Sequence, residues 1–207
     1  IYNAGINNSS AGQTAIYYGQ LSDVFEDSFW IEDPYQLKDN SWDDVGKMEF
    51  FMDSDTSICD LVYKKTITMA EFTGGDYSVD EDSDRAEDYD LEDWYAYVVA
   101  MGDRAACIGL FKEEVDEDDL EAQRVTSGTI DRVINNEAAG WEISLRDSSD
   151  WSERKEKWMA KNSNVKIGVA GALIIRNGKT ISPGQLKAGE RLYIVRDDYF
   201  AKVVLVK

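Results

Sequence analysis

The chain has 207 residues, of which 43% are hydrophobic and 12% aromatic, and its 41 acidic and 22 basic side chains give a net charge of −19. A large negative charge disfavours contact with phosphate backbones, so we expect no nucleic-acid partner. Histidine is absent, which removes the commonest general base and the commonest transition-metal ligand. Because no apolar run approaches the about 20 residues of a membrane helix, we expect no membrane insertion.

Residues 1–22 contain no charged side chain, although the chain as a whole is 30% charged. Residues 1–16 are therefore either a leader ahead of the first strand or an arm that adds to the sheet edge of a neighbouring subunit. The apolar contacts of such an arm would come from Ile1, Tyr2, Ile6 and Ile16. No initiator Met precedes Ile1, so we expect a processed N-terminus or a chain cut from a longer protein.

Short runs of β-branched and aromatic residues, bounded by Gly, Asn and Asp, predict an all-β chain. Residues 94–112 and 190–207 each read as a β-hairpin, with turns at Gly102-Asp103 and Asp197-Asp198. Helical character is expected only at residues 120–124 and 152–161.

Four blocks recur in the same order in the two halves of the chain, which indicates a tandem duplication. Residues 18–24 match 127–133, Trp30 and Trp42 match Trp141 and Trp151, residues 65–72 match 179–186, and Leu110-Phe111-Lys112 matches Leu205-Val206-Lys207. Five or six strands and one small helix per unit suit an OB-like small β-barrel. We therefore expect two tandem OB-like small β-barrels, related by internal duplication, behind an uncharged N-terminal arm.

The expected segments of the chain are an arm (1–16), a first barrel (17–112), an acidic linker (113–123) and a second barrel (124–207). The first barrel carries an acidic insertion at residues 74–93, with ten acidic residues and one basic residue. Blocks of like charge usually stay solvated, so both acidic stretches can also be plain linkers.

Alternating carboxylates in two loops are candidate ligands for Ca²⁺, which takes about six to eight oxygen atoms. The candidate ligands are Asp53, Asp55, Asp80, Asp82, Asp84, Asp88 and Asp90. The spacing does not fit an EF-hand, because Arg85 stands where Gly is needed and Leu91 stands where a bidentate Glu is needed. The alternative is an acidic loop that only keeps the protein soluble.

The two cysteines, Cys59 and Cys107, permit one disulfide bond, which would suit an exported protein. The alternative is a pair of buried small side chains, since free Cys is among the most buried residue types.

Charge is divided unevenly along the chain. Residues 1–123 hold 31 acids and 7 bases, a net charge of −24, whereas residues 124–207 hold 10 acids and 15 bases, a net charge of +5. Opposite charges at the two ends favour head-to-tail association with copies of the same chain.

The six tryptophans are candidates for stacking on sugar rings, which would make polysaccharide a partner. Trp30, Trp42, Trp141 and Trp151 occur at matched positions and are more simply explained as core anchors. Paired carboxylates could in principle hydrolyse glycosides, but among 41 acids such pairs carry no specificity. Without a nucleophile beside a base or a phosphate-binding loop, we expect no enzyme.

Residues 172–206 resemble the small OB-like β repeats of S-layer-associated and other cell-surface proteins of Gram-positive anaerobes. The resemblance rests on Asn177-Gly178-Lys179, Ile181-Ser182, Gln185-Leu186-Lys187, Gly189 and residues 191–196. It implies a secreted or cell-surface structural protein and carries no catalytic residues.

Taken together, these features predict a non-catalytic structural subunit of an extracellular surface layer or filament, self-associating head to tail and stabilised by Ca²⁺. The alternative is a carbohydrate-binding module of a larger secreted protein.

Overall fold

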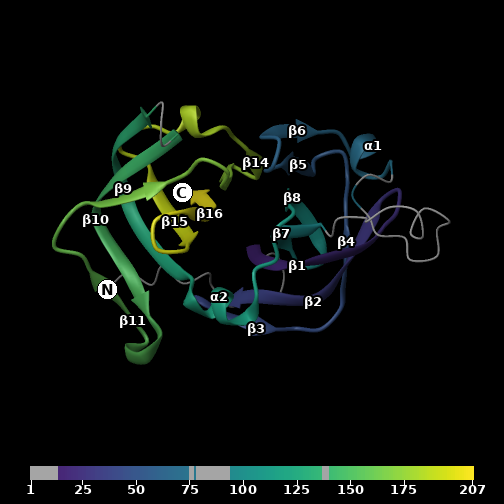
Figure 1. Cartoon of the computed structure of the whole chain (residues 1–207), viewed down its shortest axis with the longest axis horizontal. Coiled ribbons are helices and arrows are strands. Elements are labelled where there is room, and N and C mark those ends of the chain that lie inside the picture. The colour runs from purple at the N-terminus through teal and green to yellow at the C-terminus, as the bar shows by residue number, and fades with distance from the viewer. Residues whose placement is uncertain (1–13, 75–76, 78–93, 137–139) are drawn as a thin grey trace. The chain divides into compact units, whose positions relative to one another are not determined.

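The computed structural model describes residues 14–74, 77, 94–136 and 140–207, and it consists almost entirely of β-sheet (Figure 1). The chain divides into two compact units, Ile1–Val115 and Asp116–Lys207. Each unit contains one eight-stranded sheet. The predicted all-β class with two domains is thus confirmed.

The first unit contains β1 (Thr14–Val24), β2 (Ser28–Lys38), β3 (Ser41–Asp44), β4 (Met48–Phe51), β5 (Ser57–Asp60), β6 (Lys65–Ile67), α1 (Met69–Phe72), β7 (Tyr95–Met101) and β8 (Arg104–Phe111). The strands pair in the order β3-β2-β1-β7-β8-β5-β6. In addition, β4 pairs with β2 on one side and, in parallel, with β8 on the other. Because β4 joins the two ends of the run β2-β1-β7-β8, these five strands close into a ring.

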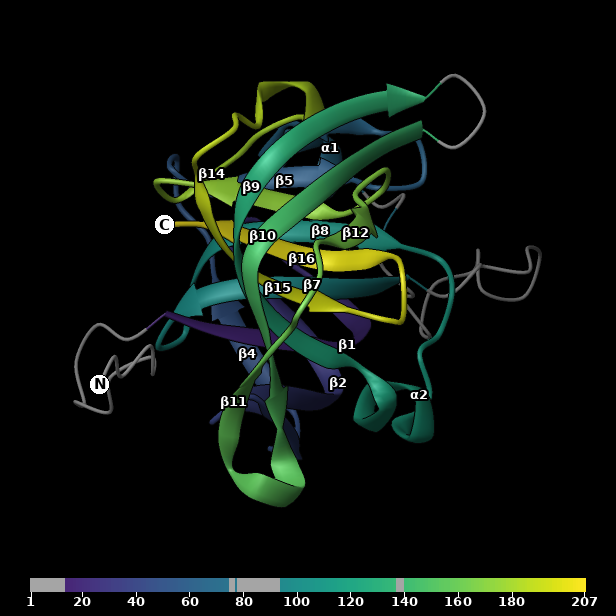
Figure 2. The same ribbon diagram turned by 90° about the vertical axis from the view of Figure 1, so that its left-hand side faces the viewer.

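The second unit contains α2 (Glu117–Ala122), β9 (Arg124–Asn136), β10 (Gly140–Ser152), the 3₁₀ turn η1 (Glu153–Lys155), β11 (Lys157–Ala160), β12 (Val165–Gly168), β13 (Leu173–Arg176), β14 (Lys179–Thr180), the 3₁₀ turn η2 (Pro183–Gln185), β15 (Arg191–Arg196) and β16 (Ala201–Val206). The strands pair in the order β11-β10-β9-β15-β16-β13-β14, with β12 on β10. Gly168 at the end of β12 forms a parallel bridge with Phe200, just before β16, and this bridge closes the ring. Figure 2 shows the long, curved pair formed by β9 and β10.

The two strand orders agree position by position: β1 to β8 occupy the places in their sheet that β9 to β16 occupy in the other. The register agrees as well, since Gly19 on β1 pairs with Ala96 on β7, and Gly128 on β9 pairs with Leu192 on β15. Gly19 has a packing reason, because a Cβ atom there would lie 2.9 Å from the backbone oxygen of Glu32.

The closing hairpins are offset by one residue from the match expected from the sequence. Ala96 pairs with Leu110, and Leu192 pairs with Val206, so Leu110 takes the ladder position of Val206 and not that of Leu205. Both faces of β7 and most of β8 are buried. Strands buried on both faces read as continuous apolar runs, which lack the alternation that fixes a register.

A capped turn precedes the closing hairpin in each unit. Thr68 and Glu71 form a capping box at α1, and Ser182 and Gln185 form one at η2. Phe72, which follows Glu71 in α1, is fully buried in the core. Capping satisfies backbone donors that would otherwise be left unpaired at the start of the turn.

The two cores differ in their side chains. In the first unit, Phe29 stacks on Phe50 with a centroid distance of 5.5 Å and meets Phe72 edge-on at 5.7 Å. In the second unit, the core is aliphatic and includes Ile143 and Ile194.

The predicted helical segments are partly wrong. Of residues 120–124, only 120–122 are helical: they end α2, which begins at Glu117, where the side chain of Asp116 accepts a hydrogen bond from the Asp119 N–H at 2.9 Å. Arg124 already begins β9. Residues 152–161 are mostly the hairpin of β10 and β11, because η1 ends at Glu156 in a left-handed conformation (φ 48°). No helix of the described residues is long and apolar enough to cross a bilayer.

Candidate functional site

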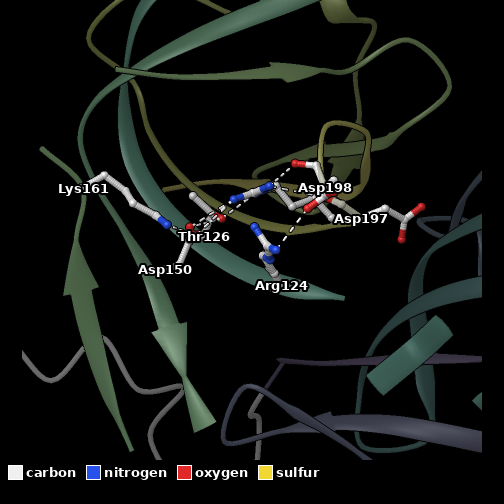
Figure 3. A network of polar contacts seen from close by, with 7 residues as sticks. Arg124, Thr126, Asp150, Lys161, Asp197 and Asp198 are labelled. Atoms are coloured by element: carbon white, nitrogen blue, oxygen red, sulfur yellow. Dashed lines mark hydrogen bonds and ion pairs between the residues drawn. The ribbon is translucent and has the colours of Figure 1, made fainter. Parts of the chain in front are cut away.

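A buried ionic network lies in the second unit, where β9, β10 and β15 run side by side (Figure 3). Thr126 on β9 pairs in register with Asp150 on β10 and with Ile194 on β15. Arg196, at the end of β15, is therefore close to both Thr126 and Asp150, and all three are buried. Lys161 follows β11, the strand on the other side of β10.

The guanidinium of Arg196 donates hydrogen bonds from all three of its nitrogens. Nε donates to Thr126 Oγ1 at 2.7 Å, and Nη2 donates to both carboxylate oxygens of Asp150 at 3.2 Å. Nη1 donates to the backbone carbonyl of Asp197 at 3.3 Å and to that of Asp198, in the turn between β15 and β16. One side chain thus joins two strands and a turn.

The Asp150 carboxylate receives further hydrogen bonds from its other neighbours. The Thr126 hydroxyl donates to Oδ1 at 2.7 Å, and Lys161 Nζ lies 2.7 Å from Oδ2. Burial alone would raise the pKa of Asp150, but the hydrogen bonds from Lys161 and Thr126 and the charges of Arg196 and Lys161 outweigh it and lower that pKa. Asp150 is therefore ionised at neutral pH.

This arrangement stabilises the fold and is poorly suited to proton transfer. A general base works best with a pKa near the operating pH, whereas the pKa of Asp150 is shifted the other way. Both carboxylate oxygens already accept hydrogen bonds from protein donors. We interpret Arg196, Asp150, Thr126 and Lys161 as a clamp, called the Arg196 clamp below, that holds the β15–β16 turn against β9 and β10.

The first unit fills the equivalent positions without charge. Tyr17 and Gln36 form the cross-strand pair of the first unit that corresponds to Thr126 and Asp150. Ala100 follows the bulge of its hairpin, at the position that Arg196 has in the second unit. The ring of Tyr17 packs edge-on against Phe50 at 5.0 Å. The clamp is therefore a feature of the second unit.

A second buried carboxylate, Asp60, lies at the end of β5. Its Oδ2 accepts a hydrogen bond from the Tyr77 hydroxyl at 3.1 Å, and its Oδ1 accepts one from the Tyr63 backbone N–H at 2.9 Å. Tyr77 belongs to the predicted acidic insertion, and its ring lies 4.8 Å from that of Trp94. Tyr77 therefore anchors one point of the insertion to the core of the first unit.

Two of the predicted calcium ligands, Asp53 and Asp55, lie in the turn after β4. Asp53 Oδ1 accepts a hydrogen bond from the Asp55 N–H at 2.8 Å, and its Oδ2 accepts one from Arg104 at 2.8 Å. The Asp55 hydrogen bond is the main cause that lowers the pKa of Asp53, and Arg104 adds to it.

The other five predicted ligands, Asp80, Asp82, Asp84, Asp88 and Asp90, lie outside the described residues. Among the residues that the structure does describe, no group of three or more Cys, Asp or Glu side chains could hold a metal ion. The Ca²⁺ site stays a prediction.

The two cysteines lie on neighbouring parallel strands and are not joined to each other in the structure. Cys59 on β5 pairs with Gly109, and Cys107 on β8 pairs with Ser57, so the two cysteines are diagonal neighbours. Cys107 is buried and Cys59 is half-buried. Burial, followed by the charge of Asp60, raises the pKa of the Cys59 thiol.

Of the four residues assigned to the N-terminal arm, Ile16 lies in the described part of the chain. It is a fully buried residue of β1 that pairs with Leu37 and Val99 of its own sheet. Ile1, Tyr2 and Ile6 lie outside the described residues.

The tryptophans do not follow the matches expected from the sequence. Trp42 on β3 pairs with Leu37, and Trp158 on β11 pairs with Trp151, so Trp42 takes the place of Trp158 in its sheet. Trp94 has no matched tryptophan in the other half, which left it a candidate for exposure, yet it is only 7% exposed. Trp151 and Trp158 form a half-buried pair with a ring distance of 5.6 Å.

Comparison of the chain with protein-family models, with curated proteins and with solved structures found no match in any of the three.

Proposed function

We propose that the chain is a non-catalytic structural subunit of an extracellular assembly, a surface layer or filament, in which copies associate head to tail. One observation carries this proposal: the two sheets have the same strand order, and the parts of the chain that contain them, residues 1–123 and 124–207, have opposite net charges of −24 and +5. The chain is then a single subunit with two related but electrostatically complementary parts.

The shared topology supports an internal duplication of an OB-like barrel. When the ring strands of the first unit are numbered along the chain, they follow the order 1-2-3-5-4, with the third and fifth strands parallel. That order, with a helix between the third and fourth strands, is typical of an OB-like barrel. The second unit has the same order, with η2 in the place of the helix.

Duplication supplies a route to polymers. Two related barrels start with related surfaces, and the opposite charges of residues 1–123 and 124–207 then favour contact between the first part of one molecule and the second part of another. Such heterologous contacts give rings if the rotation closes and filaments if it does not.

Sheet edges offer a place for the uncharged arm. β3 and β6 end the first sheet, and β11 and β14 end the second. Edge strands present unpaired backbone groups, to which an extended segment can add. In the proposed assembly, the arm with Ile1, Tyr2 and Ile6 adds to such an edge on a neighbouring copy.

Location and metal binding rest on the sequence. The resemblance of residues 172–206 to cell-surface repeats supports a secreted or cell-surface location, and the alternating Asp residues at 80–90 support Ca²⁺ binding at the acidic surface.

Electron microscopy of the purified protein tests this function. We expect ordered filaments or sheets from the full chain, and a loss of order when residues 1–13 are removed, a deletion that leaves β1 intact. Particles of monomer size at every concentration would contradict the proposal, and unchanged order after the deletion would remove the arm from it.

A further inference from the structure

We propose that copies of this chain join through two equivalent outer faces: that of β1, β2 and β4 in one molecule and that of β9, β10 and β12 in the next. The acidic face consists of Asp23, Phe25, Glu32, Glu49 and Phe51. The basic face consists of Arg132, Ile134, Arg146, Lys166 and Phe200. This inference rests on the proposed function and names the surfaces that carry it.

The charges of the two faces are reversed at equivalent ladder positions. On the acidic face, Trp30 of β2 pairs with Glu49 of β4. On the basic face, Ser144 of β10 pairs with Lys166 of β12. Each of these pairs alternates with core residues of its strands, so Glu49 and Lys166 occupy the same outward position in the two units.

Two more positions follow the same rule. Glu32 on β2 pairs with Gln20 on β1, next to a bulge in the pairing of these two strands. Arg146 on β10 pairs with Thr129 on β9, next to the corresponding bulge of the second unit. Asp23 comes one residue before the core-packing Val24, and Arg132 comes one residue before the core-packing Val133. The three carboxylates of the acidic face thus occupy the same outward positions in the first unit as the three cations of the basic face occupy in the second.

Each face also exposes large apolar side chains at its edge. Phe25 and Phe51 are 50% and 41% exposed, and Ile134 and Phe200 are 36% and 56% exposed. Phe25, directly after β1, and Ile134, near the end of β9, each follow a core-packing valine, Val24 or Val133. Phe51 takes the place of Gly168, where a Cβ atom would lie 2.7 Å from the ring of Tyr199 and 3.0 Å from that of Phe200. The second unit therefore presents the ring of Phe200 at the place where the first presents that of Phe51.

Four of the six charged groups form exposed ion pairs within their own units. Glu32 pairs with Lys47, Arg132 with Asp131 at 3.3 Å, Arg146 with Asp147 at 3.5 Å, and Lys166 with Glu142 at 3.6 Å. Exposed ion pairs of this kind contribute little in water. Exchanging them for partners on another molecule therefore costs little.

The occupant that these faces fit is a second copy of this chain. An acidic face repels another acidic face, and a basic face repels another basic face, whereas acidic and basic faces attract each other around apolar side chains that need cover. Each molecule carries one face of each kind, so each contact leaves an acidic face free at one end and a basic face free at the other.

Two charge-reversal variants test this contact. D23K/E49K makes the acidic face basic, and R132E/K166E makes the basic face acidic. Like charges set against each other across an interface weaken binding by several kcal/mol, so we expect self-association of either variant to be at least about 100-fold weaker than that of the intact protein.

An equimolar mixture of the two variants is the decisive sample. D23K/E49K then carries two basic faces and R132E/K166E two acidic ones, so the two proteins complement each other and associate in alternation. Light scattering and sedimentation velocity should show no assembly of either variant alone and assembly of the mixture. E113K/E114K and R154E/K155E, which change net charge equally outside both faces, should assemble like the intact protein.

The outcomes separate this inference from the proposed function. If the intact protein does not assemble, the proposed function fails. If the intact protein assembles and either reversal variant assembles equally well, or if the mixture fails to assemble while both control variants do, the assignment of these faces is wrong and self-association uses another surface.

Discussion

Replacing Arg196 by Met removes the cation of the Arg196 clamp and keeps most of its apolar stem. Breaking a buried ion pair by removing one partner costs about 3–5 kcal/mol. Here Lys161 still lies 2.7 Å from the Asp150 carboxylate, so we expect the free energy of unfolding of the second unit to fall by about 2–3 kcal/mol, at or below the lower end of that range.

The local readout is amide hydrogen exchange in β15, β16 and the turn between them. Arg196 donates to the carbonyls of Asp197 and Asp198 in that turn, so its loss should open the hairpin more often than the rest of the chain. A cost of about 2–3 kcal/mol corresponds to exchange about 30- to 150-fold faster in amides that exchange through this opening. Urea unfolding gives the accompanying change in global stability.

Arg124→Met is the matched control. Arg124 forms an exposed ion pair with Asp198 at 3.1 Å, and exposed pairs contribute about 0–1 kcal/mol. The reasoning is refuted if R196M is as stable as the intact protein, or if R124M and R196M accelerate exchange equally.

The clamp also predicts how the stability of the second unit depends on pH. Asp150 has a lowered pKa in the folded protein, so the unfolded chain binds its proton more readily than the folded one. The stabilisation by Asp150 is complete above the ordinary pKa of an aspartate, about 4, and is lost as pH falls through the lower folded pKa. The gap between the urea midpoints of the intact protein and of D150N should narrow as pH falls from neutral to pH 3, whereas a constant gap would contradict this account.

Three further predictions concern the first unit. Tyr77→Phe removes the hydrogen bond that the Tyr77 hydroxyl donates to the buried Asp60 carboxylate and should destabilise the unit by about 1–3 kcal/mol. Tyr63→Phe should not, because Tyr63 serves Asp60 through its backbone N–H, and equal urea midpoints for the two variants would contradict the assignment. Alkylation followed by mass spectrometry should find Cys59 and Cys107 both as thiols, which are labelled slowly until urea unfolds the unit. If both cysteines stay unlabelled after unfolding, they are joined in a disulfide. If Ca²⁺ binds the acidic insertion, millimolar Ca²⁺ should raise Tm relative to chelator, and an unchanged Tm would exclude a stabilising site.

Local sequence patterns were sufficient for the all-β class and for part of the correspondence between the two units, but not for the short helices. The turn residues Gly102 and Asp103 do separate β7 from β8, and Thr68 with Glu71 forms the capping box that such a pair of residues is typical of. The sequence could not fix which residues of β8 and β16 are equivalent, because strands buried on both faces lack the alternation that would set the register.

Long-range partners explain the remaining errors. Trp94 lacked an obvious core position, yet it is buried against Tyr77, a residue of the acidic insertion. Ile16 was grouped with the arm because its neighbours are uncharged, yet it pairs with Val99 more than 80 residues later.

The Arg196 clamp had one visible signal, an arginine at the end of an apolar strand run. Its partner Asp150 is 46 residues away in sequence, and the contact depends on the pairing of β9 with both β10 and β15. Without that register, nothing in the sequence selects Asp150 from the 41 acidic residues.

Sedimentation velocity of the intact 23.4 kDa chain over a range of protein and salt concentrations tests the central claim most directly. Head-to-tail association through oppositely charged parts predicts species that grow with protein concentration and shrink as salt screens the contact. A single species of monomer mass at every protein and salt concentration would contradict it.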